Sequence, residues 1–133
     1  MSKATPLAGL RVIELGSSVA VPYGTWILST LGATVIKVER PDTGDDCRVW
    51  GTGWYGDVSA IFVALNAGKH SVTVDLKDPE QIATLRRFIL EQADVVVQNL
   101  RPGVAEKLGL GADELCAEND RLIYVNCGAF GTE

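Results

Sequence analysis

Five short runs rich in valine and isoleucine recur along this chain of 133 residues, and segments with helix signals separate them. The runs are residues 11–15, 34–39, 71–75, 94–98 and 122–126. Strands that alternate with helices pair in parallel, because each helix carries the chain back to the end of the sheet where it began. We therefore predict an α/β fold, a Rossmann-like open doubly wound parallel sheet of about five strands with helices on both faces.

Helix signals fill the gaps between these runs. Pro22 suits a first helical turn, where its missing N–H would lack a partner anyway, and Gly32 suits the position just past the helix end. Asp78 is a candidate N-cap before Pro79, and apolar residues then recur at helical spacing. Shorter helices are predicted over 59–65, 104–108 and 112–118. The pattern has no internal repeat or linker, which predicts one domain over residues 1–133.

The segment 40–58 lacks a strand or helix pattern and is rich in Gly, Asp and Trp. A connection of this length inside a compact domain is usually functional or forms a mobile cover. We predict an irregular loop here. The aromatic residues in or beside it are predicted to be exposed, namely Trp50, Trp54, Tyr55 and Phe62.

The charge balance limits the partners of this chain. It has 17 Asp and Glu against 12 Lys and Arg, a formal net charge of −5. Nucleic acid and anionic membrane surfaces both attract basic proteins, so neither is predicted as a partner. An anionic ligand would need a local cluster of cations.

The cysteines and the first residues indicate the compartment. Cys47, Cys116 and Cys127 are an odd number without CxxC or CxxH spacing, so neither a disulfide framework nor a metal site is predicted. No apolar run follows Met1, and no stretch approaches the ~20 apolar residues of a membrane helix. These features predict a cytoplasmic protein.

In a doubly wound sheet, ligands bind beyond the carboxyl ends of the strands, near the point where the strand order reverses. Gly16-Ser17-Ser18-Val19-Ala20 follows the first strand and lacks the G-x-G-x-x-G pattern of dinucleotide sites. His70, the only histidine, stands at the start of a strand, which disfavours a Ser-His-Asp triad. We predict neither NAD binding nor serine hydrolase chemistry.

Cations stand close to the predicted strand ends. Arg40 follows the second strand, Lys69 precedes the third, Arg101 follows the fourth, and Lys107 lies one short helix later. Arginine forks and lysine point charges suit phosphate oxygens. Taken alone, these residues leave two interpretations open, a phosphate site and an ordinary charged surface.

Motifs along the whole chain add a stronger signal. Pro6-Leu7-Ala8-Gly9-Leu10-Arg11-Val12-Ile13-Glu14-Leu15 resembles the segment P-L-x-G-[VL]-[RK]-V-[LI]-[DE]-[LF] that opens the family III coenzyme A transferases, the CaiB/BaiF family. Residues 31–41 resemble its L-G-A-x-V-[IV]-K-[VI]-E-[RP]-P segment, and residues 93–110 resemble its A-D-V, N-[FY]-R-P-G and L-G block. Further matches cover 44–50, 65–77 and 119–131, in family order.

This resemblance implies how much of the protein is present. Residues 1–133 would be the N-terminal Rossmann-like portion of the large domain, the portion that binds coenzyme A. The segment with the catalytic aspartate and the second domain would lie downstream and are absent from this sequence. The full-length parent would be an interlocked homodimer.

The resemblance also implies the chemistry. A transferase of this family uses an aspartate that attacks an acyl-CoA thioester, forms an acyl anhydride and passes the acyl group between coenzyme A and a free carboxylic acid. Racemases of the family exchange the α-proton of the thioester with an acid–base pair instead. None of the aspartates here matches that aspartate, so no catalytic residue is assigned and the isolated chain is predicted to be inactive. Three interpretations stay open: a CoA-transferase, a racemase, and a non-catalytic nucleotide-binding or assembly module.

Five residues of the coenzyme A site follow from the matching motifs. Arg40 matches the arginine that reaches the adenosine-phosphate end of coenzyme A. Asn99, Leu100 and Arg101 match an N-[FY]-R block beside the ligand, and Lys107 matches a basic position after it.

Lys69 and Val19 complete the predicted coenzyme A site. Lys69 lies in a matching block, and Val19 stands where formyl-coenzyme A transferases have a glutamine near the thioester. That valine disfavours formyl or oxalyl transfer and leaves the acyl group open. Leu100 replaces an aromatic residue, which removes a stacking surface for adenine.

Overall fold

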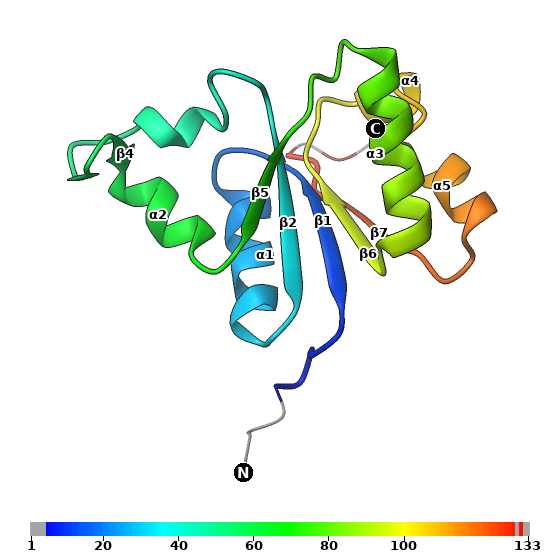
Figure 1. Ribbon diagram of the computed structural model, residues 1–133, viewed down its shortest axis with the longest axis horizontal. Coiled ribbons are helices and arrows are strands. Elements are labelled where there is room, and N and C mark those ends of the chain that lie inside the picture. Colours follow the sequence, from blue (N-terminus) through cyan, green and yellow to red (C-terminus); the bar gives the residue numbers. More distant parts are fainter. Residues whose placement is uncertain (1–4, 130, 132–133) are drawn as a thin grey trace.

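The computed structural model describes residues 5–129 and 131. Its centre is a parallel sheet with the strand order β5-β2-β1-β6-β7 (Figure 1). The strands are β1 (Arg11–Leu15), β2 (Thr34–Glu39), β5 (His70–Thr73), β6 (Val95–Gln98) and β7 (Ile123–Asn126). The chain builds outward from β1 to β5 and then returns to the other side of β1, so the order reverses between β1 and β6. This open, doubly wound sheet confirms the predicted fold class.

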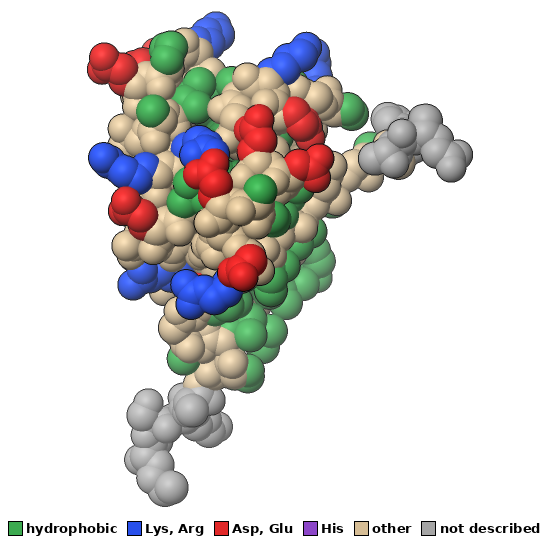
Figure 2. Space-filling view, turned by 90° about the vertical axis from the view of Figure 1, so that its right-hand side faces the viewer, with side chains coloured by type: hydrophobic (Ala, Val, Ile, Leu, Met, Phe, Trp, Pro, Cys, Tyr) green, Lys and Arg blue, Asp and Glu red, His purple; other side chains and the backbone are tan. Residues whose placement is uncertain are grey.

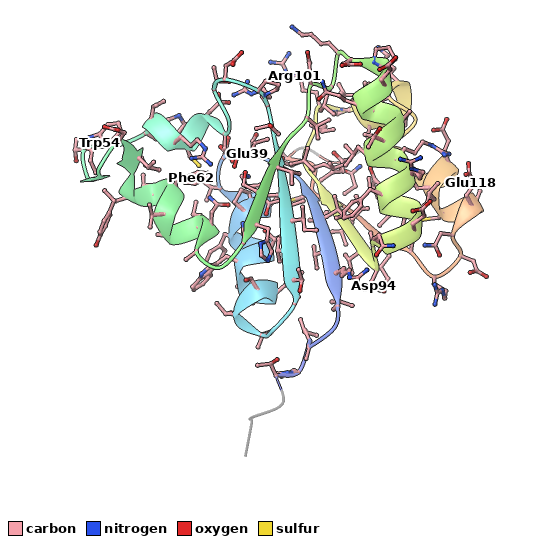
Figure 3. All side chains as sticks on the ribbon, viewed as in Figure 1. Glu39, Trp54, Phe62, Asp94, Arg101 and Glu118 are labelled. Carbon is pink, nitrogen blue, oxygen red and sulfur yellow. The ribbon has the colours of Figure 1, made fainter. Side chains whose placement is uncertain are left out.

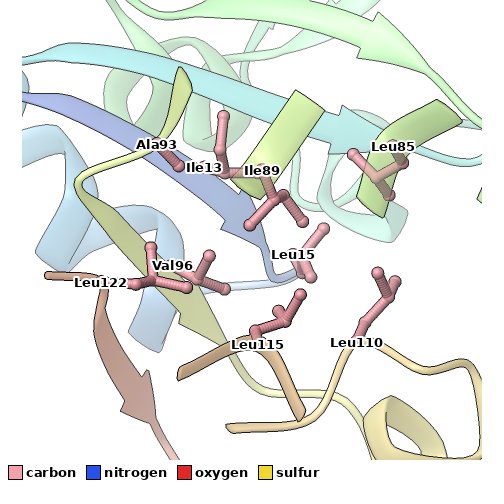
Figure 4. Close-up of a cluster of buried hydrophobic side chains, with 9 residues drawn as sticks. All are labelled: Ile13, Leu15, Leu85, Ile89, Ala93, Val96, Leu110, Leu115 and Leu122. Carbon is pink, nitrogen blue, oxygen red and sulfur yellow. The ribbon is translucent and has the colours of Figure 1, made fainter. Parts of the chain in front are cut away.

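Helices cover both faces of the sheet (Figure 1). They are α1 (Ala20–Thr30), α2 (Ala60–Asn66), α3 (Pro79–Gln92), α4 (Val104–Lys107) and α5 (Ala112–Glu118). Alternate residues of β1 point to opposite faces and enter two apolar clusters. Ile13 and Leu15 pack with Leu85 and Ile89 of α3 and with Leu115 of α5 (Figure 4).

The second cluster lies on the α1 face of the sheet. Val12 of β1 packs there with Val35 of β2, with Val95 and Val97 of β6, and with Val21 of α1. All four residues of β6 are buried, as expected for a central parallel strand. The two clusters place the sheet between two layers of helix.

The predicted helix ends agree with the local chemistry. The Asp78 carboxylate accepts the N–H groups of Glu80 and Gln81, which caps α3 in front of Pro79. Gly32 has φ +104°, a conformation that only glycine adopts at low cost, and it follows the end of α1. By contrast, Val19, the residue before the start of α1, provides no side-chain cap for the first N–H groups of that helix.

The prediction of an irregular loop over 40–58 is wrong in part. A 3₁₀ turn, η1, spans Asp46–Val49, and a hairpin follows with strands β3 (Trp54–Tyr55) and β4 (Val58–Ser59). Gly56 and Asp57 form its two-residue turn, and Gly56 has φ +58°. A two-residue loop that contains glycine is typical of such hairpins. The strands are too short for a period-2 pattern to be seen in the sequence.

Three of the four aromatic residues predicted to be exposed lie on the surface. Trp50, Trp54 and Tyr55 have exposed fractions of 40%, 50% and 73%. The prediction is wrong for Phe62, which is half-buried because the Arg48 guanidinium stacks over its ring at 3.9 Å from the centroid. That contact shields the ring by a cation–π interaction.

The side of the molecule that carries α3 and α5 has acidic and basic side chains on one surface (Figure 2). Hydrophobic side chains gather towards the lower edge of the same view. Mixed charge on the outer side of a helix layer is typical of a solvated surface.

In the part of the chain that the structure describes, every helix is too short or too polar to cross a lipid bilayer.

Candidate functional site

Three loops meet at the carboxyl edge of the sheet, the edge that the strand order marks as the ligand side. They follow β1 (residues 16–19), β2 (residues 40–46) and β6 (residues 99–103). A hollow of about 200 Å³ lies between them. Its walls include Gly16, Ser17, Arg40, Asp45 and Leu100, together with apolar residues at the strand ends.

Asn99 ties the loop after β6 to the loop after β1. Its Oδ1 accepts the N–H of Ser17 at 3.0 Å, and its Nδ2 donates to the Ser17 carbonyl at 3.0 Å. Gly16 allows the tight turn beside them, since a Cβ at this position would lie 2.3 Å from Cγ1 of Val21. The predicted site residue Asn99 therefore lies at this edge, where it holds the backbone of the neighbouring loop.

Asp45 holds the same loop from the other side. The Ser18 N–H donates to the Asp45 carboxylate, at 3.0 Å from Oδ1 and 3.2 Å from Oδ2. Ser18 has φ +69°, in the left-handed region that disfavours residues with a Cβ. The backbone of residues 17 and 18 is thus fixed by side chains from two other loops.

Beneath this loop lies a buried charge network made of Glu14, Lys37, Asp45 and Lys69. Lys37 Nζ lies 2.7 Å from Glu14 Oε1 and 2.8 Å from Asp45 Oδ2, and it donates to the Gly16 carbonyl at 2.9 Å. The side chains of Lys37, Glu14 and Asp45 are at most 1% exposed. Two cations and two carboxylates balance one another, which makes this burial tolerable.

Lys69 belongs to this network rather than to the surface of the site. Its Nζ lies 2.8 Å from each of three acceptors, namely Glu14 Oε2, the Pro22 carbonyl and Asn66 Oδ1. Its side chain is only 2% exposed. Lys69 is therefore buried, unlike the exposed cations Arg40, Arg101 and Lys107 with which it was predicted to bind the ligand.

The protonation states of the network follow from burial and from its ion pairs. Burial by itself would lower the pKa of Lys37, but Glu14 and Asp45 more than offset this and raise it above its ordinary value. Burial by itself would raise the pKa of Asp45, but the hydrogen bonds from Lys37, Cys47 and Ser18 lower it. Burial lowers the pKa of Lys69, and the nearby Lys37 charge adds to that effect. Near neutral pH, Lys37 and Asp45 therefore form an ion pair.

A second buried carboxylate shapes the loop after β2. The Arg48 guanidinium binds Glu39 through two hydrogen bonds of 2.7 and 2.8 Å, and the Asp45 N–H donates to Glu39 at 3.0 Å. Burial opposes the charge of Glu39, but Arg48, Ser71 and the Asp45 N–H lower its pKa to about 2. Glu39 is thus an ionised structural group at the carboxyl edge (Figure 3).

Cys47 lies in the same loop and is fully buried. Burial and the neighbouring Asp45 carboxylate raise the pKa of its thiol to about 12. The thiolate is the nucleophilic form of cysteine, so this side chain is unsuited to attack a thioester.

Arg40 is the cation that lines the hollow, together with Glu39, Asp45 and Asp46. The Arg40 side chain is 55% exposed, and its guanidinium binds the Gly44 carbonyl, at 3.0 and 3.1 Å, and the Asp46 carboxylate. Arg101 lies on the surface at the same edge (Figure 3), and Lys107 is exposed at the end of α4. The structure therefore brings Arg40, Leu100 and Arg101 to one edge of the sheet.

The remaining predicted site residue, Val19, directly precedes α1 and follows Ser18. It is 47% exposed. Its position at an uncapped helix start places it next to the loop that Asn99 and Asp45 hold. Val19 and Asn99 do not line the hollow themselves, and their role in binding coenzyme A stays a prediction.

Sequence reasoning missed Ser18, Asp45 and the Glu14–Lys37 pair. A signal was present, because Glu14 and Lys37 are isolated charges within apolar strands, and they are direct partners in the register of β1 and β2. Opposite charges at facing positions near the ends of two predicted strands indicate a buried pair. The contact between Asp45 and Ser18 joins residues 27 apart in irregular backbone, where no periodicity points to it.

A larger groove, of about 470 Å³, lies on the face of the sheet between β5 and α3. Apolar side chains of Ile36, Val38, Val72 and Phe88 line much of it, and its lining includes acidic residues but no Lys or Arg. An anionic ligand would find no cation there. The carboxyl edge is therefore the better candidate site for such a ligand.

Comparisons with known proteins bear on the whole chain. The family model described as CoA-transferase family III matches residues 7–133. Acetyl-CoA:oxalate CoA-transferase of Acetobacter aceti is 43% identical over 126 residues, which cover 95% of this chain and 32% of that protein. Succinate–glutarate CoA-transferase of Agrobacterium fabrum is 40% identical over 136 residues, which cover 98% of this chain and 34% of that protein.

A solved structure gives the same result. The crystal structure of a CAIB/BAIF family protein from Brucella suis superposes with a TM-score of 0.84 at 43% identity, covering 93% of this chain and 33% of that one. The chain therefore spans about a third of the length of the relatives that it matches.

Proposed function

Since this chain belongs to CoA-transferase family III, we propose that it is the coenzyme A-binding portion of an enzyme that moves coenzyme A between an acyl-CoA and a free carboxylic acid. The relatives named for such activities support this reaction class. In this proposal, residues 1–133 form the N-terminal part of a large domain, and the full-length parent is an interlocked homodimer.

The observation that carries the proposal is the hollow at the carboxyl edge. Arg40 and Leu100 line it from opposite sides of β1, and Arg101 and Lys107 follow in the chain beyond Leu100. Coenzyme A presents phosphates at one end and a long, weakly polar arm, so it suits cations next to an apolar wall.

The charge arrangement supports an anionic ligand although the chain as a whole is acidic. Coenzyme A is strongly anionic at neutral pH, and the chain carries a net charge of −5. The buried carboxylates Glu14, Glu39 and Asp45 each have a cation as partner, so they add little net negative charge to this edge. The exposed Arg101 and Lys107, together with Arg40 once a phosphate displaces its partner Asp46, then provide the local positive field that phosphates require.

The finer chemistry of the proposal needs a carboxylate that reaches the thioester. Glu14, Glu39 and Asp45 are buried and held by cations, which makes them unsuited to nucleophilic attack. We therefore expect no turnover by the isolated chain. The aspartate that forms the acyl anhydride would come from the remaining chain of a full-length parent.

A coenzyme A titration of the 133-residue chain tests the binding role. We expect weak binding by the isolated chain, with a Kd on the order of 1 mM. Arg40→Ala and Arg101→Ala should each weaken it by about tenfold or more at low salt, because one charge-assisted contact contributes about 1.5–3 kcal/mol. Arg87→Ala, which removes an exposed cation from α3, is the matched control and should change little.

Two results would contradict the proposal. Unchanged affinity in both the Arg40 and the Arg101 variants would mean that the cations at this edge do not bind the phosphates. Turnover of acyl-CoA donors with free acids by the purified chain would show that a nucleophile lies within it. Exchange of the α-proton without acyl transfer, measured on a full-length parent, would favour the racemase alternative.

A further inference from the structure

The loop after β1 is held by three side chains, of which Lys37 and Asp45 are buried and Asn99 is half-buried. Lys37 binds the Gly16 carbonyl, Asn99 binds both backbone groups of Ser17, and Asp45 binds the Ser18 N–H. Both polar groups of two consecutive peptides, the one between Gly16 and Ser17 and the one between Ser17 and Ser18, are therefore bound by side chains from three other elements. Such a loop presents its backbone to a ligand in one fixed orientation.

Ser18 is the strained point of this loop. Among the residues that the structure describes, Ser18 and Asp42 are the non-glycine residues with positive φ. A serine prefers negative φ, so its left-handed conformation persists only where the surroundings impose it. The contact that the structure provides is the one from the Ser18 N–H to the Asp45 carboxylate.

Asp45 has the properties needed to impose that conformation. Its side chain is 1% exposed, and Lys37 Nζ fixes it at 2.8 Å. Its own N–H is held by Glu39, and its Oδ1 also accepts the Cys47 N–H at 3.0 Å, which caps η1. The carboxylate therefore has little freedom, and it links the loop that carries Arg40 to the loop that leads to Val19.

We propose that Asp45 is a positioning residue for the coenzyme A site, which acts by holding Ser18 in its left-handed conformation. This inference rests on the proposed function, because it takes the hollow as the place where the ligand binds. Without the carboxylate, Ser18 returns to negative φ and turns the peptide groups of residues 17–19 away from the hollow. The ligand then loses a preformed wall, while the phosphate-binding cations stay in place.

The Asp45→Ala variant of the 133-residue chain tests the proposal, with Ser18→Gly as the rescue. Alanine removes the oxygen that accepts the Ser18 N–H, whereas asparagine would keep an acceptor there. Glycine adopts positive φ without a steric cost, so it should keep the loop conformation even where Asp45 is lost. We expect Asp45→Ala to weaken coenzyme A binding about tenfold, or about 1.4 kcal/mol. The double variant Asp45→Ala with Ser18→Gly should return to within about twofold of the unmodified chain.

Two further measurements separate positioning from a general loss of structure. An intense NOE between the amide proton and Hα of Ser18 reports positive φ, and it should weaken in Asp45→Ala. Ser18→Val keeps Asp45 and its ion pair but resists positive φ, so it should weaken binding to a similar degree. Asp57→Asn removes one negative charge from the exposed hairpin turn and should behave as the unmodified chain does.

Each outcome decides the question. Failure of Ser18→Gly to restore binding, or wild-type affinity in Ser18→Val, would overturn the proposal. If Asp45→Ala does not fold, the affinity of the Ser18→Val variant decides it alone. If the unmodified chain does not bind coenzyme A, the proposed function fails, and the Ser18 NOE still shows whether Asp45 sets that backbone.

Discussion

Lys37 is the residue whose loss should destabilise this fold most specifically, and Lys37→Met is the substitution that tests it. Methionine matches the length of the lysine stem but removes the ammonium. That ammonium lies 2.7 Å from Glu14 and 2.8 Å from Asp45, and its side chain is 1% exposed. The variant would therefore leave two buried carboxylates with Lys69 as the remaining cation of the network.

The size of the effect follows from this geometry. Breaking a buried pair by removing one partner costs about 3–5 kcal/mol, because the other charge stays buried without compensation. A domain of this size is stable by roughly 5–15 kcal/mol, so the loss is a large fraction of the total. With a urea slope of about 1–3 kcal/mol per M, the midpoint of unfolding should fall by roughly 2 M.

The contribution of this ion pair to the stability of the fold depends on pH. The raised pKa of Lys37 adds stability that is complete below its ordinary value of 10.5 and is lost as the pH rises through the folded value. The lowered pKa of Asp45 adds stability that is complete above its ordinary value of 3.8 and is lost as the pH falls through the folded value. In Lys37→Met, burial without a cation would raise the pKa of Asp45, so acid should neutralise it. The difference in unfolding free energy between the unmodified chain and Lys37→Met should therefore become smaller below about pH 4.

Urea unfolding followed by circular dichroism at pH 7 and pH 3 measures both effects. Lys77→Met is the control, because Lys77 is exposed. A loss below about 1 kcal/mol at pH 7, the size expected of an exposed pair, would refute the reasoning. A difference in unfolding free energy that is larger at pH 3 than at pH 7 would refute the charge states assigned to Lys37 and Asp45.

Two further predictions concern the surface. Asp46→Asn should tighten coenzyme A binding about twofold to fivefold, because Asp46 competes with phosphate for Arg40. The gain is limited because this exposed ion pair contributes at most about 1 kcal/mol. Weaker binding of coenzyme A in a calorimetric titration would contradict the prediction. The chain should also self-associate, because Trp54 and Tyr55 on the hairpin are 50% and 73% exposed and lie near Val49, which is 70% exposed. A single monomeric species across a concentration series in sedimentation would exclude this.

The fold could be predicted because each strand carries its own signal. The strands of the sheet are runs of four to six residues rich in β-branched side chains, and Asp78, Pro79 and Gly32 mark helix ends by local chemistry. The hairpin at Trp54–Ser59 could not be found in the same way, since its two strands have two residues each. Its Gly56-Asp57 turn was the available signal.

The edge of the sheet on which the candidate site lies could be predicted, but the contacts inside it could not. Arg40 follows β2 directly and Arg101 lies three residues after the end of β6, so the fold alone places them at one edge of the sheet. Lys69 precedes a strand, and its position depends on a side chain that reaches back to Glu14, 55 residues away. No sequence pattern indicates the contact between Lys69 and Glu14 over such a separation. The pairing of Glu14 with Lys37, by contrast, follows from the register of β1 and β2 once the two strands are aligned.

The Glu14–Lys37 pair also affects which sheet this chain forms. Side chains alternate along a strand, so sliding β2 by one residue against β1 would turn Lys37 to the α3 face, into the apolar cluster of Leu85 and Ile89. Glu39 would turn with it and lose Arg48. A sheet with this shifted register would therefore bury an ionised side chain without a partner, which lowers its stability. Its apolar contacts would differ little, because the strands are similar valine-rich runs. The buried ions discriminate among competing arrangements of the strands during folding more than they strengthen the correct one.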